Sequence, residues 1–275
     1  MPITRRDALR ALVAAGVGAA TGTVAHGVAY ERHAVRMVTA DLPVSGFPPA
    51  LDGLRIGFLT DIHHSLAVPA DDVVRAVNLV RAAAPDMVLL GGDYVTFADR
   101  RFIEPVAELL APLADAPEGA FAVLGNHDDD REVPAALARQ RLTVLKDQRT
   151  TVALRGERVD LAGIRFWTRR PADIARVLRG TGETTLLFAH DPRRLPEAAA
   201  LDVQLVLSGH THGGQVLMPG VGAIAGRKFP VLAGVARQEN TTLFVSRGVG
   251  TVYVPVRINC PPEVALLTLR RRSNI

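Results

Sequence analysis

The sequence predicts an α/β domain over residues 33–270, with strands that are covered on both faces. Two observations lead to this prediction. Short apolar runs of strand length recur along the chain, and stretches with a helical spacing of apolar residues separate the early ones. In addition, 48% of the 275 residues are hydrophobic, which is enough to bury one sizeable core. This content excludes a disordered or fibrous protein.

The expected elements follow one another without an internal repeat or linker. Apolar runs predict strands at residues 56–59, 87–90, 121–124, 185–189, 203–207, 243–245 and 265–269. Helical periodicity predicts helices at residues 70–84, 103–114, 133–140 and 171–179. The first helix is expected to stop at Pro85, which cannot continue it. One domain is therefore the simplest organisation, followed by a short basic tail at residues 271–275.

Residues 1–30 do not fit this pattern and are predicted to be a targeting segment. Arg5 and Arg6 precede a weakly apolar stretch, residues 11–25, that is somewhat shorter than the roughly twenty residues a spanning helix needs. The paired arginines resemble a twin-arginine export signal, although Ala8 stands where that pattern prefers Phe. This resemblance implies export by the twin-arginine translocation machinery to the periplasm or the outer face of the cytoplasmic membrane, with residues 11–25 as an anchor. The alternative is an amphipathic helix with two incidental arginines.

Charge and cysteine content narrow the classes of function. The formal net charge is +4, and the first thirty residues contribute half of it. Apart from Arg270, Arg271 and Arg272 no basic stripe remains, and aromatic residues are only 5%, so we expect no nucleic-acid partner. Cys260 is the only cysteine, which excludes an intrachain disulfide and a thiolate metal site. A metal ion would have to be bound by His, Asn and carboxylate side chains.

Side chains that can bind metals follow five of the predicted strands, at the point where each strand ends. The segments are Thr60-Asp61-Ile62-His63, Gly91-Gly92-Asp93, Gly125-Asn126-His127-Asp128, His190-Asp191 and Gly209-His210-Thr211-His212. Each of them alone is typical of a turn or a helix cap. Together they contain five of the eight histidines, and open α/β sheets bind their ligands at the carboxyl ends of the strands. We leave out His64, because its side chain should point away from that of His63.

These five segments match, in order, the signature blocks of the calcineurin-like metallophosphoesterases, and the resemblance covers roughly residues 33–270. It implies a sandwich of two mixed β-sheets flanked by helices, with a metal site at the carboxyl ends of the strands. Residues 209–215 and 245–250 also resemble one bacterial branch of that superfamily. Its members are exported or membrane-attached phosphodiesterases with twin-arginine signals, and they include enzymes that hydrolyse UDP-2,3-diacylglucosamine.

The resemblance implies two divalent metal ions bridged by Asp93. The first ion would be bound by Asp61, His63 and His212, and the second by Asn126, His190 and His210. The spacing of Asp61 and His63 suits a shared metal, because alternate residues of an extended segment point to the same side. Nitrogen and oxygen ligands without sulfur favour Mn, Fe, Zn or Co over Ca or Cu(I).

The implied activity is hydrolysis of a phosphoester, most directly a phosphodiester, by a hydroxide that bridges the two ions. His127 is assigned to no metal and is a candidate to protonate the leaving oxygen or to stabilise the transition state. Asp128 is a candidate to orient it. A turn before the next helix explains both residues almost equally well.

Other residues support weaker hypotheses. Gly213, Gly214 and Gln215 either let the backbone approach the metals or form a turn. Arg247 and Arg257 are candidates for contact with a phosphate.

Two alternative functions remain open. One is a glycolipid pyrophosphatase of the UDP-2,3-diacylglucosamine type, acting on a lipid-linked pyrophosphate at the membrane. It needs a groove for acyl chains, which the apolar segment 216–236 would provide unless it is a loop packed on the core. The other is a non-catalytic metal-binding scaffold with the same fold. Such a protein should have lost metal ligands, whereas all seven are present here.

Overall fold

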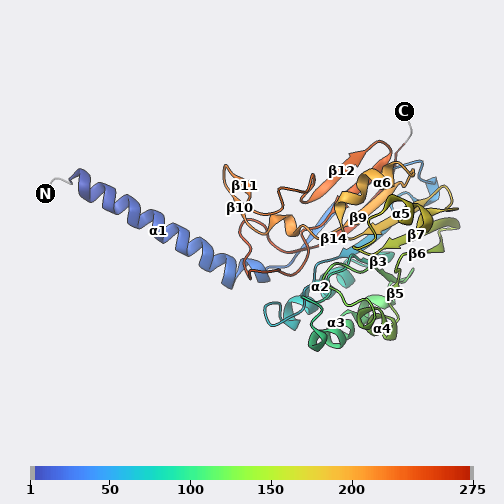
Figure 1. The fold of residues 1–275 in the computed structure, drawn as a ribbon, viewed down its shortest axis with the longest axis horizontal. Coiled ribbons are helices and arrows are strands. Elements are labelled where there is room, and N and C mark those ends of the chain that lie inside the picture. Colours follow the sequence, from blue (N-terminus) through green and yellow to red (C-terminus); the bar gives the residue numbers. More distant parts are fainter. Residues whose placement is uncertain (1–3, 273–275) are drawn as a thin grey trace.

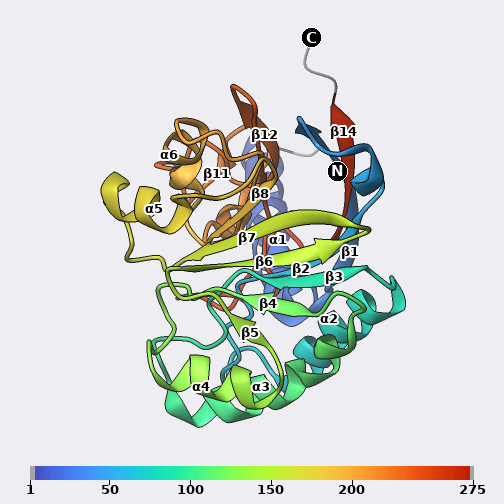
Figure 2. The same ribbon diagram turned by 90° about the vertical axis from the view of Figure 1, so that its right-hand side faces the viewer.

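Two six-stranded mixed β-sheets pack face to face, with helices on the outer face of each (Figures 1 and 2). The computed structural model describes residues 4–272. The first sheet has the order β1-β14-β2-β3-β4-β5 and the second the order β12-β13-β9-β8-β7-β6. This architecture confirms the predicted α/β sandwich of two mixed sheets.

The strands are short, and the two sheets take theirs from different parts of the chain. The first sheet contains β1 (Arg36–Ser45), β2 (Arg55–Leu59), β3 (Met87–Leu90), β4 (Ala120–Ala122), β5 (Thr143–Val144) and β14 (Glu263–Arg272). The second contains β6 (Gln148–Leu154), β7 (Glu157–Ile164), β8 (Thr185–Ala189), β9 (Leu205–Ser208), β12 (Gly234–Gln238) and β13 (Thr241–Val245). A separate hairpin pairs β10 (Leu217–Met218) with β11 (Gly222–Ala223).

The helices divide between the outer faces, and the core is layered accordingly. The first sheet packs against α2 (Ala70–Ala82), α3 (Ile103–Leu110) and α4 (Glu132–Arg139), and the second against α5 (Pro171–Leu178) and α6 (Leu195–Ala199). Between the sheets lies a third apolar layer, in which the rings of Phe58 and Phe244 meet edge to face at 6.2 Å. Burial of apolar surface in these three layers is the main stabilising contribution.

Each predicted strand and helix is present, with boundaries shifted by a few residues, but seven further strands lie outside the predicted runs. These are β1, β5, β6, β7, β10, β11 and β12. The β6–β7 pair is antiparallel, and β6 lies at the edge of its sheet with mostly exposed or half-buried polar side chains. An edge strand needs no continuous apolar run, which is why hydrophobicity alone missed it. Strand β14 extends to Arg272, so residues 271 and 272 of the predicted tail belong to a strand, while residues 273–275 lie outside the described residues.

The strand directions bring the predicted site segments together. Strands β2, β3 and β4 are parallel neighbours in the first sheet, and β8 and β9 are parallel neighbours in the second. The carboxyl ends of parallel strands lie at the same edge of a sheet, so loops from both sheets meet at one end of the sandwich.

Helix α1 (Arg5–Ala29) projects away from the sandwich and is exposed over nearly its whole length (Figure 1). Its apolar side chains are not gathered on one face, so the amphipathic alternative is wrong. By length and composition, the stretch Arg5–His33 could cross a membrane, a test that signal sequences also pass.

The end of α1 packs tightly on the domain. Gly27 accepts a hydrogen bond from the Arg257 amide, and a Cβ at this position would lie 2.5 Å from the Arg257 carbonyl oxygen. Beyond the helix, Glu31 accepts a hydrogen bond from the Cys260 amide at 2.7 Å, and His33 Nδ1 lies 2.6 Å from an Asp72 carboxylate oxygen. The last turn of α1 and the residues after it are therefore part of the folded domain.

Candidate metal centre

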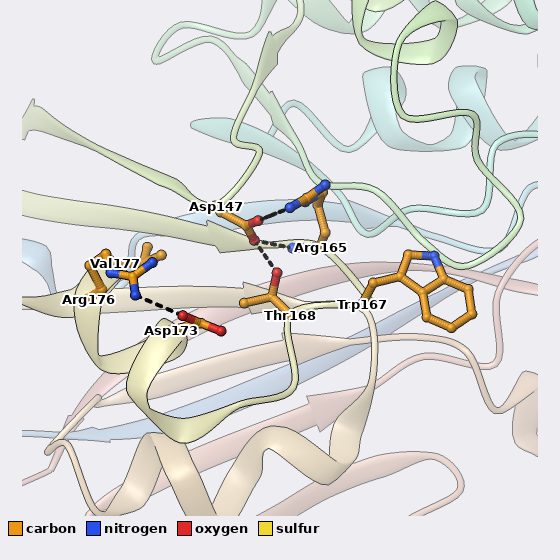
Figure 3. A pocket seen from close by; sticks show the side chains of 7 residues that line it. All are labelled: Asp147, Arg165, Trp167, Thr168, Asp173, Arg176 and Val177. Carbon is orange, nitrogen blue, oxygen red and sulfur yellow. Dashed lines mark hydrogen bonds and ion pairs between the residues drawn. The ribbon is translucent and has the colours of Figure 1, made fainter.

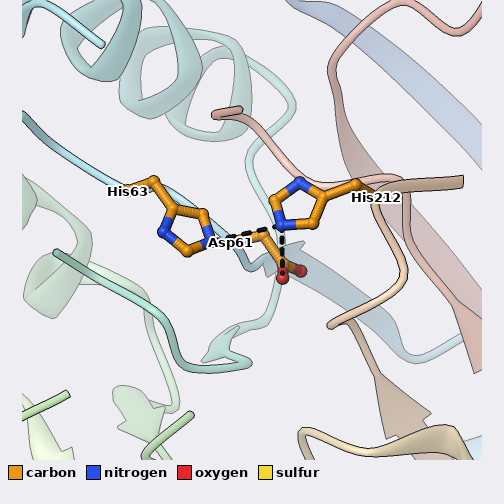
Figure 4. A group of neighbouring side chains, drawn as sticks. All are labelled: Asp61, His63 and His212. Atoms are coloured by element: carbon orange, nitrogen blue, oxygen red, sulfur yellow. Dashed lines mark hydrogen bonds and ion pairs between the residues drawn. The ribbon is translucent and has the colours of Figure 1, made fainter. Parts of the chain in front are cut away.

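The first group of candidate ligands consists of Asp61, His63 and His212, from the loops that follow β2 and β9. All three are buried, and their ligand atoms lie within 4.8 Å of one another. The Nε2 atoms of His63 and His212 are 3.1 Å apart, and His212 Nε2 lies 3.4 Å from Asp61 Oδ1 (Figure 4). The structure thus brings together the three side chains that the sequence predicts for the first metal.

The second group consists of Asp93, His190 and His210, which follow β3, β8 and β9, and its ligand atoms also lie within 4.8 Å of one another. Asp93 Oδ2 lies 3.2 Å from His190 Nε2 and 3.4 Å from His63 Nε2, so one carboxylate oxygen faces both groups. The other oxygen accepts a hydrogen bond from the His127 amide at 2.8 Å, which orients the carboxylate. A ligand shared by two metal ions requires such a position.

One unpaired oxygen and one close pair of nitrogens, in the loops that carry these residues, fit the binding of divalent metal ions. The side-chain oxygen of Asn126 is buried and has no hydrogen-bond partner in the described part of the chain, although buried polar atoms are rarely left unpaired. The 3.1 Å approach of the His63 and His212 nitrogens requires a proton or a cation between their lone pairs. Two nitrogen atoms bound to one tetrahedral zinc ion, each at about 2.0–2.1 Å from it, would lie at a similar distance from each other.

The loops that carry these residues have an unusual backbone conformation. Asp61, His63 and Asp93 have φ of 53°, 50° and 57°, and His210 and His212 have φ of 70° and 51°. This left-handed region costs a residue other than glycine on the order of 1–3 kcal/mol. The extended conformation expected between Asp61 and His63 is therefore wrong, although both side chains reach the same group.

Two glycines make room for the carboxylates. A Cβ at Gly125 would lie 2.1 Å from Asp93 Oδ1, and a Cβ at Gly209 would lie 2.1 Å from Asp61 Oδ2. The amide that follows Gly209, that of His210, donates to Asp61 Oδ1 at 2.9 Å. Any larger residue would displace a carboxylate from its group, so these glycines belong to the site.

Burial and mutual charge perturb the titration of the groups. Burial raises the pKa of Asp61 to about 6 and lowers the pKa of His63 to about 4. Burial also disfavours the charged form of His190, but the nearby Asp93 and Asp61 carboxylates raise its pKa to about 10. Against the effect of burial, the charge of His190 holds the pKa of Asp93 well below its usual range. The charged forms of Asp93 and His190 thus favour each other, and a bound metal ion would compete with protons for both side chains.

His127 belongs to neither group of ligands but lies against the first. Its ring centre is 4.9 Å from that of His63, and its Nδ1 accepts a hydrogen bond from the Phe97 amide at 3.1 Å. A neutral imidazole that accepts at Nδ1 carries its proton on Nε2. Burial lowers the pKa of His127 and favours this neutral form, which can donate from Nε2.

Asp128 does not orient His127, which corrects the sequence-based hypothesis. Its carboxylate accepts hydrogen bonds from the backbone amides of Asp93, Tyr94 and Gly125, each at 2.8 Å. It therefore ties the loop after β3 to the loop after β4 and holds the backbone of Asp93. Asp128 is a positioning residue.

Comparison with known proteins agrees with this geometry. A sequence model described as calcineurin-like phosphoesterase matches residues 54–214, a range that contains every candidate ligand. The chain belongs to this family. The membership confirms the resemblance at the level of the superfamily and associates the fold with metal-dependent phosphoester hydrolysis.

Proteins of two bacteria are similar to this phosphoesterase over most of its length. The chain is 33% identical over 230 residues to phosphodiesterase YaeI of Escherichia coli (strain K12), covering 78% of this chain and 82% of that protein. It is 26% identical over 281 residues to the uncharacterized metallophosphoesterase YkuE of Bacillus subtilis (strain 168), covering 98% of each. A solved structure of Haemophilus influenzae NAD nucleotidase (NadN) aligns over 72% of this chain and 50% of that one, with 15% identity and a TM-score of 0.49.

Several other predicted site residues of this phosphoesterase have structural roles. The side chain of Gln215 donates to the Val254 carbonyl and accepts from the Val252 amide, which fits the turn interpretation of residues 213–215. Arg257 is fully buried and donates to backbone carbonyls, among them those of Gly250 and Cys260. Its predicted contact with a phosphate is therefore wrong.

Two more predictions concern side chains next to the ligands. Arg247 lies near Glu263, with its Nε 3.7 Å from a carboxylate oxygen, and its contact with a phosphate stays a prediction. His64 points away from the centre as expected, because its Nδ1 lies 2.9 Å from the Val68 carbonyl oxygen.

Aromatic residues around the centre were not predicted. Phe97 and Tyr253 are 65% and 79% exposed, and their ring centres lie 4.9 and 6.2 Å from that of His127. Phe166 and Phe229 both lie next to His210, with ring centres at 4.8 and 5.2 Å from its ring. The sequence signal that would have found Phe97 and Phe166 is their position just after a site segment or a strand.

Proposed function

We propose that this phosphoesterase is a dinuclear metal-dependent phosphodiesterase. The observation that supports it most is the position of Asp93 Oδ2 between His63 and His190. Asp61, His63 and His212 would hold one ion and Asn126, His190 and His210 the other, with Asp93 shared. Two divalent ions of Mn, Fe, Zn or Co, bound by these residues, would supply Lewis-acid chemistry, which neutralises phosphoryl charge and lowers the pKa of water.

The residues of the chain would then divide the remaining work. The hydrogen bonds to Asp93 Oδ1 and to the Asp128 carboxylate keep the shared ligand and its loop in place. Nε2 of His127, which carries the proton of the neutral ring, would deliver it to the leaving oxygen. A phosphodiester is favoured over other phosphoesters by the similarity to a protein named phosphodiesterase.

A second candidate function is hydrolysis of a lipid-linked pyrophosphate of the UDP-2,3-diacylglucosamine type. One observation favours it: the apolar side chains of Met218, Val221 and Ile224, in and around the β10–β11 hairpin, are exposed rather than packed on the core. Acyl chains are ligands that such side chains could contact.

A metal-by-substrate screen tests the function. The domain without residues 1–26 keeps the contacts that Gly27 and Glu31 make, and it would be assayed after removal of bound metal and addition of one divalent metal at a time. We expect turnover of bis(4-nitrophenyl) phosphate with two ions bound per chain. Faster turnover of UDP-2,3-diacylglucosamine than of any soluble diester would favour the glycolipid function. Two bound ions without turnover of any phosphoester would support a non-catalytic scaffold.

We further propose that the protein is exported by the twin-arginine route and held at the outer face of the cytoplasmic membrane by α1. Support comes from Arg5 and Arg6 at the start of α1, from the exposure of that helix and from its length and composition. The contacts of Gly27, Glu31 and His33 with the domain favour retention of at least the last turn of the helix.

Changing Arg5 and Arg6 together to lysine tests the export route. The variant should remain in the cytoplasm with its metal-dependent activity intact, because the twin-arginine route transports folded proteins and the substitution leaves the domain unchanged. Export at the normal rate would refute the route. Extraction of the wild-type membrane fraction with alkaline carbonate tests anchoring, since an anchored protein stays with the lipid and a processed one is released.

A further inference from the structure

Arg169 is a cation without a carboxylate partner that lies beside the second ligand group. It follows β7, in the loop that also carries Phe166 and Trp167. Its guanidinium carbon lies 4.6 Å from the centre of the Phe166 ring and 4.9 Å from the centre of the Trp167 ring. The side chain is exposed, and no carboxylate in residues 4–272 forms an ion pair with it.

The rings connect Arg169 to the metal centre. Phe166 is buried, and its ring centre lies 4.8 Å from that of His210 and 6.1 Å from that of His190. The Phe166 ring therefore contacts both the guanidinium of Arg169 and the ring of the candidate ligand His210. Stacking on two rings restricts the arginine side chain before any ligand binds, which lowers the entropic cost of binding.

Other arginines near this loop are already paired, unlike Arg169. Arg193 lies over Phe229, the other ring next to His210, but its guanidinium binds both oxygens of Asp191 at 2.7–3.1 Å. In the hollow behind the loop, Arg165 pairs with Asp147 and Arg176 with Asp173 (Figure 3).

Trp167 is the only tryptophan of the chain and is 61% exposed. Its ring projects away from the charged side chains of the hollow behind the loop (Figure 3). With Arg169, it thus presents an aromatic surface next to an available positive charge.

We propose that Arg169 and Trp167 form a subsite for a second phosphoryl group of the substrate and the planar base attached to it. The subsite selects nucleoside diphosphate diesters, which deepens the proposed function and rests on it. A guanidinium binds phosphoryl oxygens through two parallel N–H groups, and an indole ring stacks on a planar base. The phosphoryl group that reacts lies at the ligand groups, and the second one, joined to it by an oxygen, reaches Arg169.

The reaction balances without a further reactant. Water adds to the phosphorus at the ligand groups, and the bond from this phosphorus to the bridging oxygen breaks. The bridging oxygen leaves with the electron pair on the second phosphoryl group. Two phosphomonoesters form, one of which carries the base.

The test compares three substrates in the full-length, metal-loaded enzyme. ADP-ribose has two phosphoryl groups and a base, and thymidine 5′-(4-nitrophenyl phosphate) has one phosphoryl group and a base. Methyl 4-nitrophenyl phosphate has one phosphoryl group and no base. Arg169→Gln should raise KM for ADP-ribose by about tenfold relative to the other two, which corresponds to one lost charge-assisted contact. Trp167→Ala should raise KM for both nucleotides by about fivefold or more relative to the methyl ester.

Arg170→Gln is the matched control, because Arg170 is the exposed neighbour of Arg169 and its Nε lies 3.6 Å from Asp173. It should change none of the three KM values. If Arg169→Gln alters all three substrates equally, or if the wild type hydrolyses the methyl ester but not ADP-ribose, the subsite is overturned. Failure of the wild type on all three substrates would overturn the proposed phosphodiesterase function and the subsite with it.

Discussion

The two sides of the metal centre differ in what surrounds them. Next to Asp61, His63 and His212 lies His127, a buried imidazole with a free Nε2, and the exposed rings beyond it carry no charge. Next to His190 and His210 lie aromatic rings that are each covered by an arginine. One side therefore offers a proton donor, and the other offers the positive charge of Arg169, which no carboxylate of residues 4–272 pairs with. We infer from this difference that proton transfer belongs to the side of His127, and substrate recognition to the other side of Asp93.

Asp93→Asn should have the largest effect, because Asp93 faces both sides. An amide has no negative charge and one acceptor oxygen, so it cannot hold two cations together. We expect a loss of activity above the 10–100-fold that is typical of residues that only support a ligand. Metal analysis should show fewer than two ions per chain. Normal turnover with two bound ions would show that Asp93 is not shared by the two ions. The two sides would then not be linked through this residue.

His127→Ala should affect chemistry on one side only. We expect both metals to be retained and a loss of 10²–10⁴-fold on alkyl or sugar esters, the range typical of general acid catalysis. The loss on nitrophenyl esters should be smaller, because a nitrophenolate leaves without a proton. Equal losses on both kinds of ester would instead favour stabilisation of the transition state. Recovery of the activity at high metal concentration would show that His127 is a metal ligand.

Asp128→Asn should have a smaller effect, through the loop that carries Asp93. Asn has one acceptor oxygen in place of the two that bind the Asp93, Tyr94 and Gly125 amides, so at least one amide loses its partner. We expect metal affinity to fall about 10–100-fold and unfolding free energy to fall by about 1–3 kcal/mol. Added metal should restore most of the activity, as determined by titration. Loss of activity without loss of metal affinity would give Asp128 a role in the chemistry.

His64→Gln should have the smallest effect, although His64 follows a candidate ligand directly. Its ring packs on Phe102 and bonds to the Val68 carbonyl rather than facing the metals. We expect metal content and turnover to remain at the wild-type level, while denaturant unfolding shows a loss of about 1 kcal/mol. His63→Gln is the matched comparison and should lose metal. Loss of metal in the His64 variant would show that the first side extends further than His63.

Much of the fold and the centre follows from local sequence patterns. Apolar runs such as residues 87–90 and 185–189 predict strands because a buried strand must be apolar on both faces, and these two have the predicted boundaries. The segments that follow the strands, such as Gly125-Asn126-His127-Asp128, contain the site residues, because a metal ligand needs a particular type of side chain at a particular spacing. The family could therefore be predicted before any contact was known.

Contacts between distant segments depend on the tertiary structure. Three contacts join parts of the chain that no local pattern connects. They are the burial of Arg257 under the end of α1, the bonds of Asp128 to amides 34 and 35 residues away, and the packing of Phe166 against His210. Edge strand β6 has too little apolar character to be seen alone and forms because β7 offers it hydrogen bonds. The sequence by itself determined which side chains could do the chemistry. Only the packing of the two sheets decided which of them face the centre and which hold the surrounding loops, because that depends on where each loop meets its neighbours.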